Sequence, residues 1–158
     1  MTSQQCLQIL RTVKDVAFAS VDAQGDPQVR IIDVMLIEED RLYFCTARGK
    51  AFYQQLIAHP RIAIVGMNRD FQMVRLSGEA RHQKYWIDRI FAENPSMCDV
   101  YPGDSRYILE TFCIDTGELS FFDLGRTPIE REQLLLGDGT PALNGFVIQE
   151  SCIGCGTC

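Results

Sequence analysis

The chain has 158 residues, a length that suits one domain with its own hydrophobic core. Hydrophobic residues make up 46% of it and charged residues 23%, an ordinary globular composition that excludes a disordered, collagen-like or coiled-coil protein. The net charge of -6 argues against nucleic acid as a partner, because binding to its phosphates needs a positive surface.

The start of the chain predicts a helix rather than a signal peptide. The first five residues are polar and uncharged, which a secretory leader is not. Thr2 and Gln5 have the spacing of a helix capping box, and leucines then recur at helical spacing. The longest apolar run, 62–67, is much shorter than the roughly 20 residues of a membrane span. We therefore expect a cytoplasmic protein without a membrane segment.

Three strands follow the first helix. Residues 16–22, 28–37 and 41–46 are rich in Val, Ile and aromatic side chains, as β-strands are. Short links join them, with Gly, Pro and Asp in 23–27 and acidic residues in 38–40. Short links between strands predict an antiparallel meander.

The middle of the chain alternates between helices and strands. Residues 51–58 predict a helix that ends before Pro60, because the residue before a proline avoids helical geometry. The next predicted elements are two strands and a second helix, at 61–67, 72–81 and 84–93.

The last predicted strands are 106–114 and 118–124, which we expect to form a hairpin around 115–117, followed by a loop-rich region with short strand-like pieces from 126 to 149. Six or seven strands with few helices predict a mainly β fold, an antiparallel barrel with peripheral helices. Strands and helices do not alternate in the β–α–β manner, and no G-x-G-x-x-G motif or Walker loop occurs. The sequence thus disfavours a doubly wound nucleotide-binding fold.

A candidate phosphate site lies between a predicted strand end and a predicted helix start, in Thr46-Ala47-Arg48-Gly49-Lys50. Backbone N–H groups at a helix N-terminus carry partial positive charge and bind anions. Thr46 adds a hydroxyl, and Arg48 and Lys50 add full charges. The alternative interpretation is a solvated turn with two surface cations.

Arg30 is a second candidate, because it lies in an otherwise apolar strand and shares a face with Ile32 by alternation. A charge there needs solvent, a carboxylate or a ligand. The alternative interpretation is an arginine that reaches solvent at a strand edge. Asp33, one position out of phase, and Gln72, at the start of a later strand, are further polar candidates.

The last cysteines, Cys152, Cys155 and Cys158, form a C-x2-C-x2-C run. This spacing equals that of the first three ligands of a bacterial ferredoxin motif, so it predicts thiolate ligands of an iron–sulfur cluster. Zinc is the alternative metal, and three unliganded cysteines is the remaining interpretation. Cys98 is a candidate fourth ligand, and a longer natural chain would complete a [4Fe-4S] site.

The other cysteines and the two histidines carry less information. Cys45 and Cys113 lie in apolar strands and are interpreted as small core residues. His59 follows a predicted helix, and His82 follows a predicted strand and is expected to be exposed. No Ser-His-Asp or Cys-His set is recognisable, so a hydrolase is not predicted.

Several motifs within residues 1–125 resemble, in order and spacing, the pyridoxamine 5'-phosphate oxidase-related FMN-binding family. They are PQVRII at 27–32, LYFCT at 42–46, GK at 49–50, LIAHPRIA at 56–63 and VRLSGEA at 74–80. Residues 106–127 are more similar to the nitroimidazole-resistance (Nim-type) branch or to flavin reductases. The family's oxidases end in an arginine-containing segment that helps to hold pyridoxal substrates. Residues 145–158 are ferredoxin-like instead, which argues against oxidation of vitamin B6.

The resemblance implies an FMN-binding split β-barrel over residues 1–149, with 150–158 as the start of an iron–sulfur segment. It also implies a homodimer with FMN at the subunit interface. The residues that it implies for FMN binding are Arg30, Ile31, Ile32 and Asp33 for the flavin and its phosphate; Cys45 and Thr46 for the ribityl chain; Arg48 and Lys50 for the phosphate; and Gln72 for the ring or the ribityl hydroxyls.

Together these observations lead to one main hypothesis and two alternatives. The main hypothesis is an FMN-binding oxidoreductase. It would be a reductase that passes electrons between an iron–sulfur centre or reduced nicotinamide and a small-molecule substrate, with an electron-transfer partner. The first alternative is a non-catalytic FMN or haem-type carrier or redox sensor, and the second is a zinc-stabilised interaction domain without flavin. The sequence names no catalytic acid or base.

Overall fold

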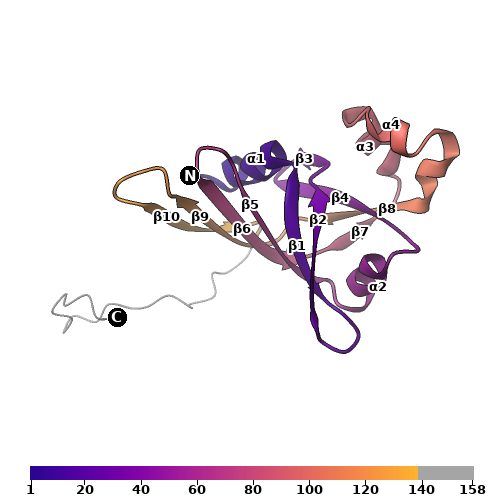
Figure 1. The fold of residues 1–158 in the computed structure, drawn as a ribbon, viewed down its shortest axis with the longest axis horizontal. Coiled ribbons are helices and arrows are strands. Elements are labelled where there is room, and N and C mark those ends of the chain that lie inside the picture. Colours follow the sequence, from indigo (N-terminus) through magenta and orange to yellow (C-terminus); the bar gives the residue numbers. More distant parts are fainter. Residues whose placement is uncertain (139–158) are drawn as a thin grey trace.

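A computed structural model describes residues 1–138 as ten strands with five helical segments around them (Figure 1). The helical segments are α1 (Ser3–Val13), α2 (Ala51–Ala58), α3 (Ile87–Glu93), α4 (Met97–Val100) and the 3-10 helix η1 (Gly103–Ile108). The strands are β1 (Asp15–Val21), β2 (Pro27–Asp33), β3 (Leu36–Glu38), β4 (Arg41–Ala47), β5 (Arg61–Met67), β6 (Gln72–Glu79), β7 (Arg81–Gln83), β8 (Leu109–Ile114), β9 (Gly117–Asp123) and β10 (Glu130–Leu136).

The strands form two antiparallel sheets. The six-stranded sheet has the order β10-β9-β6-β5-β1-β2, and the four-stranded sheet has the order β3-β4-β8-β7. Both sheets bury one face in a common core. The alternation of buried and more exposed positions along β1 and β5 places the core between the sheets, and the buried positions are apolar except for Ser20. The predicted mainly β, antiparallel fold is confirmed.

Local sequence signals account for the helices that bracket this core. The capping box of α1 is present: the Gln5 backbone N–H donates to Thr2 Oγ1 at 3.2 Å, and the Thr2 N–H donates to Gln5 Oε1 at 2.8 Å. Helix α2 has the predicted bounds.

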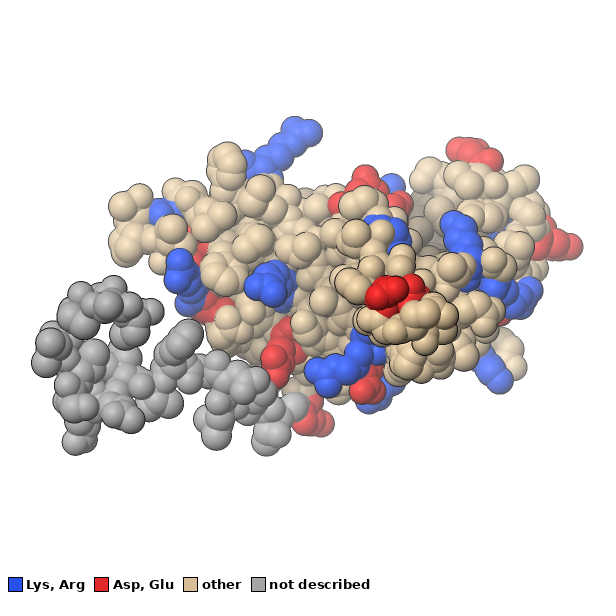
Figure 2. All heavy atoms as spheres, turned by 60° about the horizontal axis from the view of Figure 1, so that its bottom comes forward, with Lys and Arg blue, Asp and Glu red and all other residues tan. Residues whose placement is uncertain are grey.

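No helix among residues 1–138 is long and apolar enough to cross a membrane. Basic and acidic side chains are intermixed on the face drawn in Figure 2.

Aromatic rings join α2 to both sheets. Phe44 of β4 is fully buried, with its ring centroid 4.8 Å from that of Phe18 and 5.7 Å from that of Phe112. Phe52 of α2 packs on the same group, 6.0 Å from Phe44. Such ring contacts add to the apolar area buried, so they hold the N-terminal turn of α2 against the barrel.

The predicted meander is wrong, because the run 28–37 is two strands in different sheets. Strand β2 ends at Asp33 and pairs with β1, whereas β3 begins at Leu36 and pairs with β4. Between them, Val34 and Met35 are both buried and carry the chain from one sheet to the other. A segment buried on both sides has no alternation, so its apolar run resembles a continuous strand.

The predicted hairpin of 106–114 and 118–124 is also wrong. Strand β8 pairs with β4 and β7, and β9 pairs with β6 and β10, so the turn between them changes sheets. Gly117 makes the crossing possible, since a Cβ atom there would lie 2.2 Å from the Ser77 carbonyl oxygen.

Smaller differences concern element bounds. Residues 103–108 form η1 instead of the start of a strand, and the predicted strand 72–81 divides into β6 and β7. The second helix starts at Ile87, three residues later than predicted, and β10 occupies part of the region predicted as loops.

Asn94 stabilises the first sheet crossing. Its side-chain N–H groups donate to the carbonyl oxygens of Met35 and Ile90, both at 2.8 Å, and its Oδ1 accepts from Arg11 Nη2 at 2.9 Å. Arg11 also donates to the carbonyl oxygen of Val34. One buried amide thus ties α1, the crossing and α3 together.

We expect the Asn94→Ala variant to lower the free energy of unfolding by about 2–4 kcal/mol, because buried carbonyls and Arg11 lose their partners. Urea denaturation of both proteins measures this. Asn68→Ala is the matched control, since that amide also makes several hydrogen bonds but in an outer turn. The prediction would be contradicted if Asn94→Ala lowered the free energy of unfolding by no more than Asn68→Ala does.

Candidate functional site

The N-terminus of α2 has the features of an anion site. Lys50 occupies the cap position with an extended backbone, and no side chain caps the helix. The first turn holds no acidic residue, and Lys50 forms no ion pair with any part of the chain that the structure describes. The free N–H groups and the ammonium group thus present positive charge together.

Thr46, at the end of β4, holds a buried polar atom without a partner. The residue is 2% exposed, and its Oγ1 makes no hydrogen bond within residues 1–138. A buried hydroxyl without a partner is costly, and such groups are rare in native proteins. Its place just before α2 makes it a candidate ligand contact.

Arg30 reaches the same helix from β2. Its guanidinium donates to Ser20 Oγ at 2.6 Å and to Gln55 Oε1 at 2.9 Å, and it lies 4.4 Å from the centroid of the Phe52 ring. Burial lowers the pKa of Arg30. All these partners are uncharged, so the positive charge lacks a carboxylate. The structure thus brings Arg30 to the first two turns of the helix that Lys50 begins.

Arg48 lies beside this helix but is bound to an acid. Its Nη1 donates to Glu110 Oε1 at 2.7 Å, and its Nη2 donates to the Tyr107 carbonyl oxygen at 2.7 Å. The other carboxylate oxygen of Glu110 lies 2.6 Å from His82 Nε2. Burial raises the pKa of Glu110, but hydrogen bonds from His82 and Arg48 outweigh burial and hold that pKa below its usual value.

The triad of Arg48, Glu110 and His82 could not be found from the sequence. His82 is exposed, as the sequence predicts, with 30% of its side chain accessible, and it lies in β7. Glu110 comes from β8, so only the pairing of β8 with both β4 and β7 brings the three groups together.

The four predicted residues of β2 do not share one face. Arg30 and Ile32 face the core, whereas Ile31 lies on the outer face and is 63% exposed. Asp33 is opposite Asp15 on β1, and its carboxylate lies 3.5 Å from Lys14 Nζ. Burial, followed by the neighbouring Asp15 carboxyl, raises the pKa of Asp33.

Cys45 faces away from the phosphate-site candidate. It packs in a second core under α3, and its sulfur lies 3.6 Å from Thr111 Oγ1. Burial raises the pKa of this thiol to about 11, so it stays protonated at neutral pH. The interpretation of Cys45 and Cys113 as core residues is confirmed.

Gln72 begins β6 and lies beside the last residue of β5, at the end of that strand farther along the chain from α2. Its side chain is held by Asn68 at 2.9 Å and by Asp123 at 3.3 Å. The seven residues of β5 span about 20 Å. Gln72 is therefore separated from the start of β5 by about the length of that strand.

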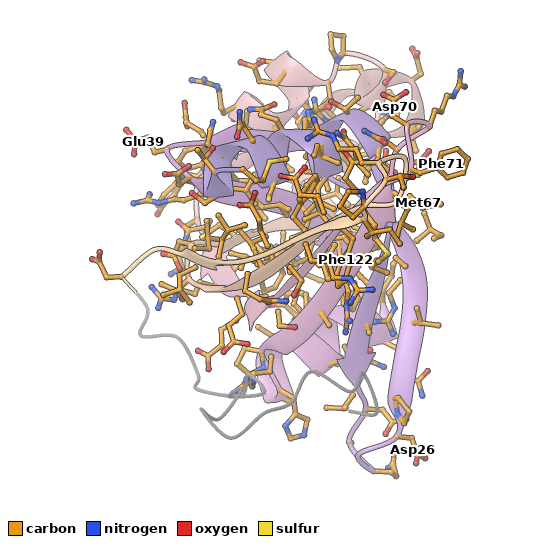
Figure 3. All side chains as sticks on the ribbon, turned by 90° about the vertical axis from the view of Figure 1, so that its left-hand side faces the viewer. Asp26, Glu39, Met67, Asp70, Phe71 and Phe122 are labelled. Carbon is orange, nitrogen blue, oxygen red and sulfur yellow. The ribbon has the colours of Figure 1, made fainter. Side chains whose placement is uncertain are left out.

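An apolar patch lies on the outer face of the six-stranded sheet, on β2 and β5. Its exposed apolar side chains are Val29, Ile31, Val65 and Met67, with Phe71 in the turn after β5, and the exposed Arg75 of β6 lies beside Val65. Figure 3 shows Phe71 pointing away from the body of the protein. Small Ala17 and Ala19 of β1 lie between β2 and β5, which keeps this face flat. A contiguous apolar surface of this kind marks a binding surface.

The three cysteines predicted to bind a cluster, Cys152, Cys155 and Cys158, lie outside the described residues. Within residues 1–138 no group of three His, Cys, Asp or Glu side chains is arranged to hold a metal ion. Cys98 is exposed in α4.

Comparison with solved structures identifies the fold. A NimC/NimA family protein from Clostridium acetobutylicum has a TM-score of 0.73 and 24% identity, covering 85% of this chain and 92% of its own. A pyridoxamine 5'-phosphate oxidase-related, FMN binding protein from Nostoc punctiforme has a TM-score of 0.59 and 16% identity, covering 83% and 91%. A heme binding protein from Mycobacterium smegmatis has a TM-score of 0.60 and 14% identity, covering 84% and 58%.

These likenesses confirm the split-barrel fold, and their names show that the fold is used with different cofactors. No curated protein matches the chain at a significant level. The sequence profile described as pyridoxamine 5'-phosphate oxidase matches residues 2–92. Because this match covers more than half of the chain, the protein belongs to the pyridoxamine 5'-phosphate oxidase family.

Proposed function

We propose that this chain binds FMN and acts as an FMN-dependent oxidoreductase on a small-molecule substrate. The observation that carries the proposal is the unpaired, buried hydroxyl of Thr46 beside the uncapped N-terminus of α2. FMN carries a phosphate and a chain of hydroxyls, so one ligand would satisfy both groups. Membership of the family and the FMN binding protein of the same fold support this choice of cofactor.

The residues present fit a phosphate dianion. Lys50 and the first N–H groups of α2 would hold it, and Arg30 adds a cation with no competing carboxylate. The Thr46 hydroxyl would bind a phosphate or ribityl oxygen. FMN, when bound, supplies the hydride or single-electron transfer that these side chains cannot perform. Their own part is to bind and orient the cofactor while the buried Phe44 and Phe52 exclude water below it.

We propose further that the active form is a homodimer with FMN between the chains. Two residues implied for FMN binding lie apart from Arg30 and Lys50, since Ile31 is on the outer face of β2 and Gln72 is at the start of β6, and a second chain would bring such residues to the same FMN. The apolar outer face, with Val29 and Ile31 exposed, offers a surface for that second chain. The predicted roles of Ile31, Asp33 and Gln72 belong to this dimeric site.

The electron supply is a separate proposal that draws on the sequence. Cys152, Cys155 and Cys158 have ferredoxin spacing, and a [4Fe-4S] cluster or reduced nicotinamide would deliver electrons to the flavin. Analysis of anaerobically purified protein for iron and acid-labile sulfide tests the cluster. Flavin bleaching by NADH or NADPH tests the nicotinamide donor.

Titration of the apoprotein with FMN, riboflavin and haemin tests the cofactor. We expect FMN to bind at least about 100-fold more tightly than riboflavin, because each charge-assisted contact to the phosphate contributes about 1.5–3 kcal/mol. Quenching of flavin fluorescence measures both affinities. Equal affinity for FMN and riboflavin, or uptake of haemin alone, would contradict the proposal.

A further inference from the structure

The phosphate-site candidate contains its own negative charge. Glu110 is opposite Thr46 in the register of β8 and β4. Its carboxylate accepts a hydrogen bond from Arg48 Nη1 at 2.7 Å. The Glu110 side chain is 18% exposed, whereas that of Arg48 is 56% exposed. An acid that is held in place thus binds a cation that remains accessible to solvent.

We propose that Glu110 competes with the cofactor phosphate for Arg48, so that Arg48 moves from the carboxylate to the phosphate when the cofactor binds. The inference rests on the proposed binding of FMN. Carboxylate and phosphate are the two anions that a guanidinium binds with paired N–H donors, and Arg48 can satisfy only one of them fully. The unbound protein therefore keeps a counterion where an empty phosphate site would otherwise leave an unpaired cation.

The structure meets two requirements of such an exchange. The first is a second partner for Glu110, because a half-buried carboxylate left alone is costly. His82 Nε2 supplies it at 2.6 Å, on the oxygen that Arg48 does not use. The second is space, and Arg48 and Glu110 line an open pocket of about 320 Å³ together with Tyr107. Lys50 is already free and does not need to exchange partners.

The exchange predicts that loss of the Glu110 charge tightens FMN binding. We expect Glu110→Gln to lower the Kd for FMN about tenfold, because a competing anion near a dianion is removed. The affinity for riboflavin, which lacks the phosphate, should not change. Glu39→Gln is the matched control, because it removes an exposed carboxylate in the turn between β3 and β4, outside the site, and it should leave both affinities unchanged.

Arg48 provides the second half of the test. Arg48→Ala alone should weaken FMN binding only slightly, about threefold, because the wild-type contact is offset by the lost pair with Glu110. In a protein that already carries Glu110→Gln, Arg48→Ala should raise the Kd for FMN again and cancel the tighter binding that Glu110→Gln produced. Glu110→Ala, which deletes both carboxylate oxygens, is a second variant if the glutamine keeps Arg48 by a neutral hydrogen bond. Thermal unfolding checks that each variant is folded.

The outcomes separate this inference from the proposed function. Wild-type binding of FMN with unchanged or weaker binding by both Glu110 variants would overturn the competition and leave the FMN proposal standing, with Glu110 as a group that positions Arg48. Tighter riboflavin binding by Glu110→Gln would also overturn it, because the gain would not involve the phosphate. No FMN binding by wild type and variants alike would overturn both.

Discussion

The double variant Arg30→Ala, Lys50→Ala is expected to lose at least about 100-fold in affinity for FMN, because two charge-assisted contacts of about 1.5–3 kcal/mol each are removed. Arg30 makes no ion pair in the described structure, and Lys50 begins a helix without a cap, so neither charge has a competing use. The affinity for riboflavin should fall much less, since riboflavin lacks the phosphate. Fluorescence titration of each apoprotein measures these affinities.

The control for this double variant removes two positive charges elsewhere. Arg41 begins β4, at the end opposite Thr46, and Arg89 of α3 is paired with Glu38 and Glu93. Arg41→Ala, Arg89→Ala should leave FMN affinity within about threefold of wild type, which is the range of screened, distant charges. Full FMN affinity in the Arg30, Lys50 variant would refute the site assignment.

The Val29→Glu variant is expected to dissociate the proposed homodimer, with a rise in dimer Kd of at least about 100-fold. Val29 is 72% exposed in the single chain, so a glutamate there has little effect on folding. In a dimer that uses the outer face of the six-stranded sheet, the same carboxylate is buried without a partner. Sedimentation equilibrium gives the dimer Kd, and FMN binding should weaken in parallel because one chain lacks the far half of the site.

Val100→Glu is the matched control for the dimer prediction. Val100 is 66% exposed in α4, well away from the outer face of the sheet, and the substitution is chemically identical. The control variant should keep the wild-type association state. If both variants associate like the wild type, the outer face does not form the interface. If Val29→Glu alone becomes monomeric yet still binds FMN at full strength, the cofactor does not need the second chain.

Local elements could be predicted because their signals are local. Helix α2 has the predicted bounds, set by Pro60 at one end and by the end of β4 at the other. The Thr2–Gln5 capping box needs only neighbouring residues, and it forms as predicted. The phosphate-site candidate depends on the same local rule, since a helix N-terminus that follows a strand exposes its N–H groups wherever it occurs.

The two sheet crossings could not be predicted. At Val34-Met35 the chain stays apolar and extended while it leaves one sheet for the other, and nothing in a short window separates that from one long strand. At 115–117 the turn residues are those of a hairpin, but β8 and β9 find other partners. Strand pairing is decided by the packing of distant segments, and turn residues only permit it.

The sequence by itself determined the mainly β class, the helix that begins at Lys50 and the type of ligand that this helix suits, because propensity, capping and alternation act over a few residues. Only the tertiary structure decided which charges at that helix are available. In the tertiary structure Arg30 has neutral partners, Arg48 is paired with the carboxylate of Glu110, and Gln72 lies beside the end of β5 rather than beside its start, which follows α2. These outcomes depend on residues that are far apart in the chain and meet only when the two sheets close around their core.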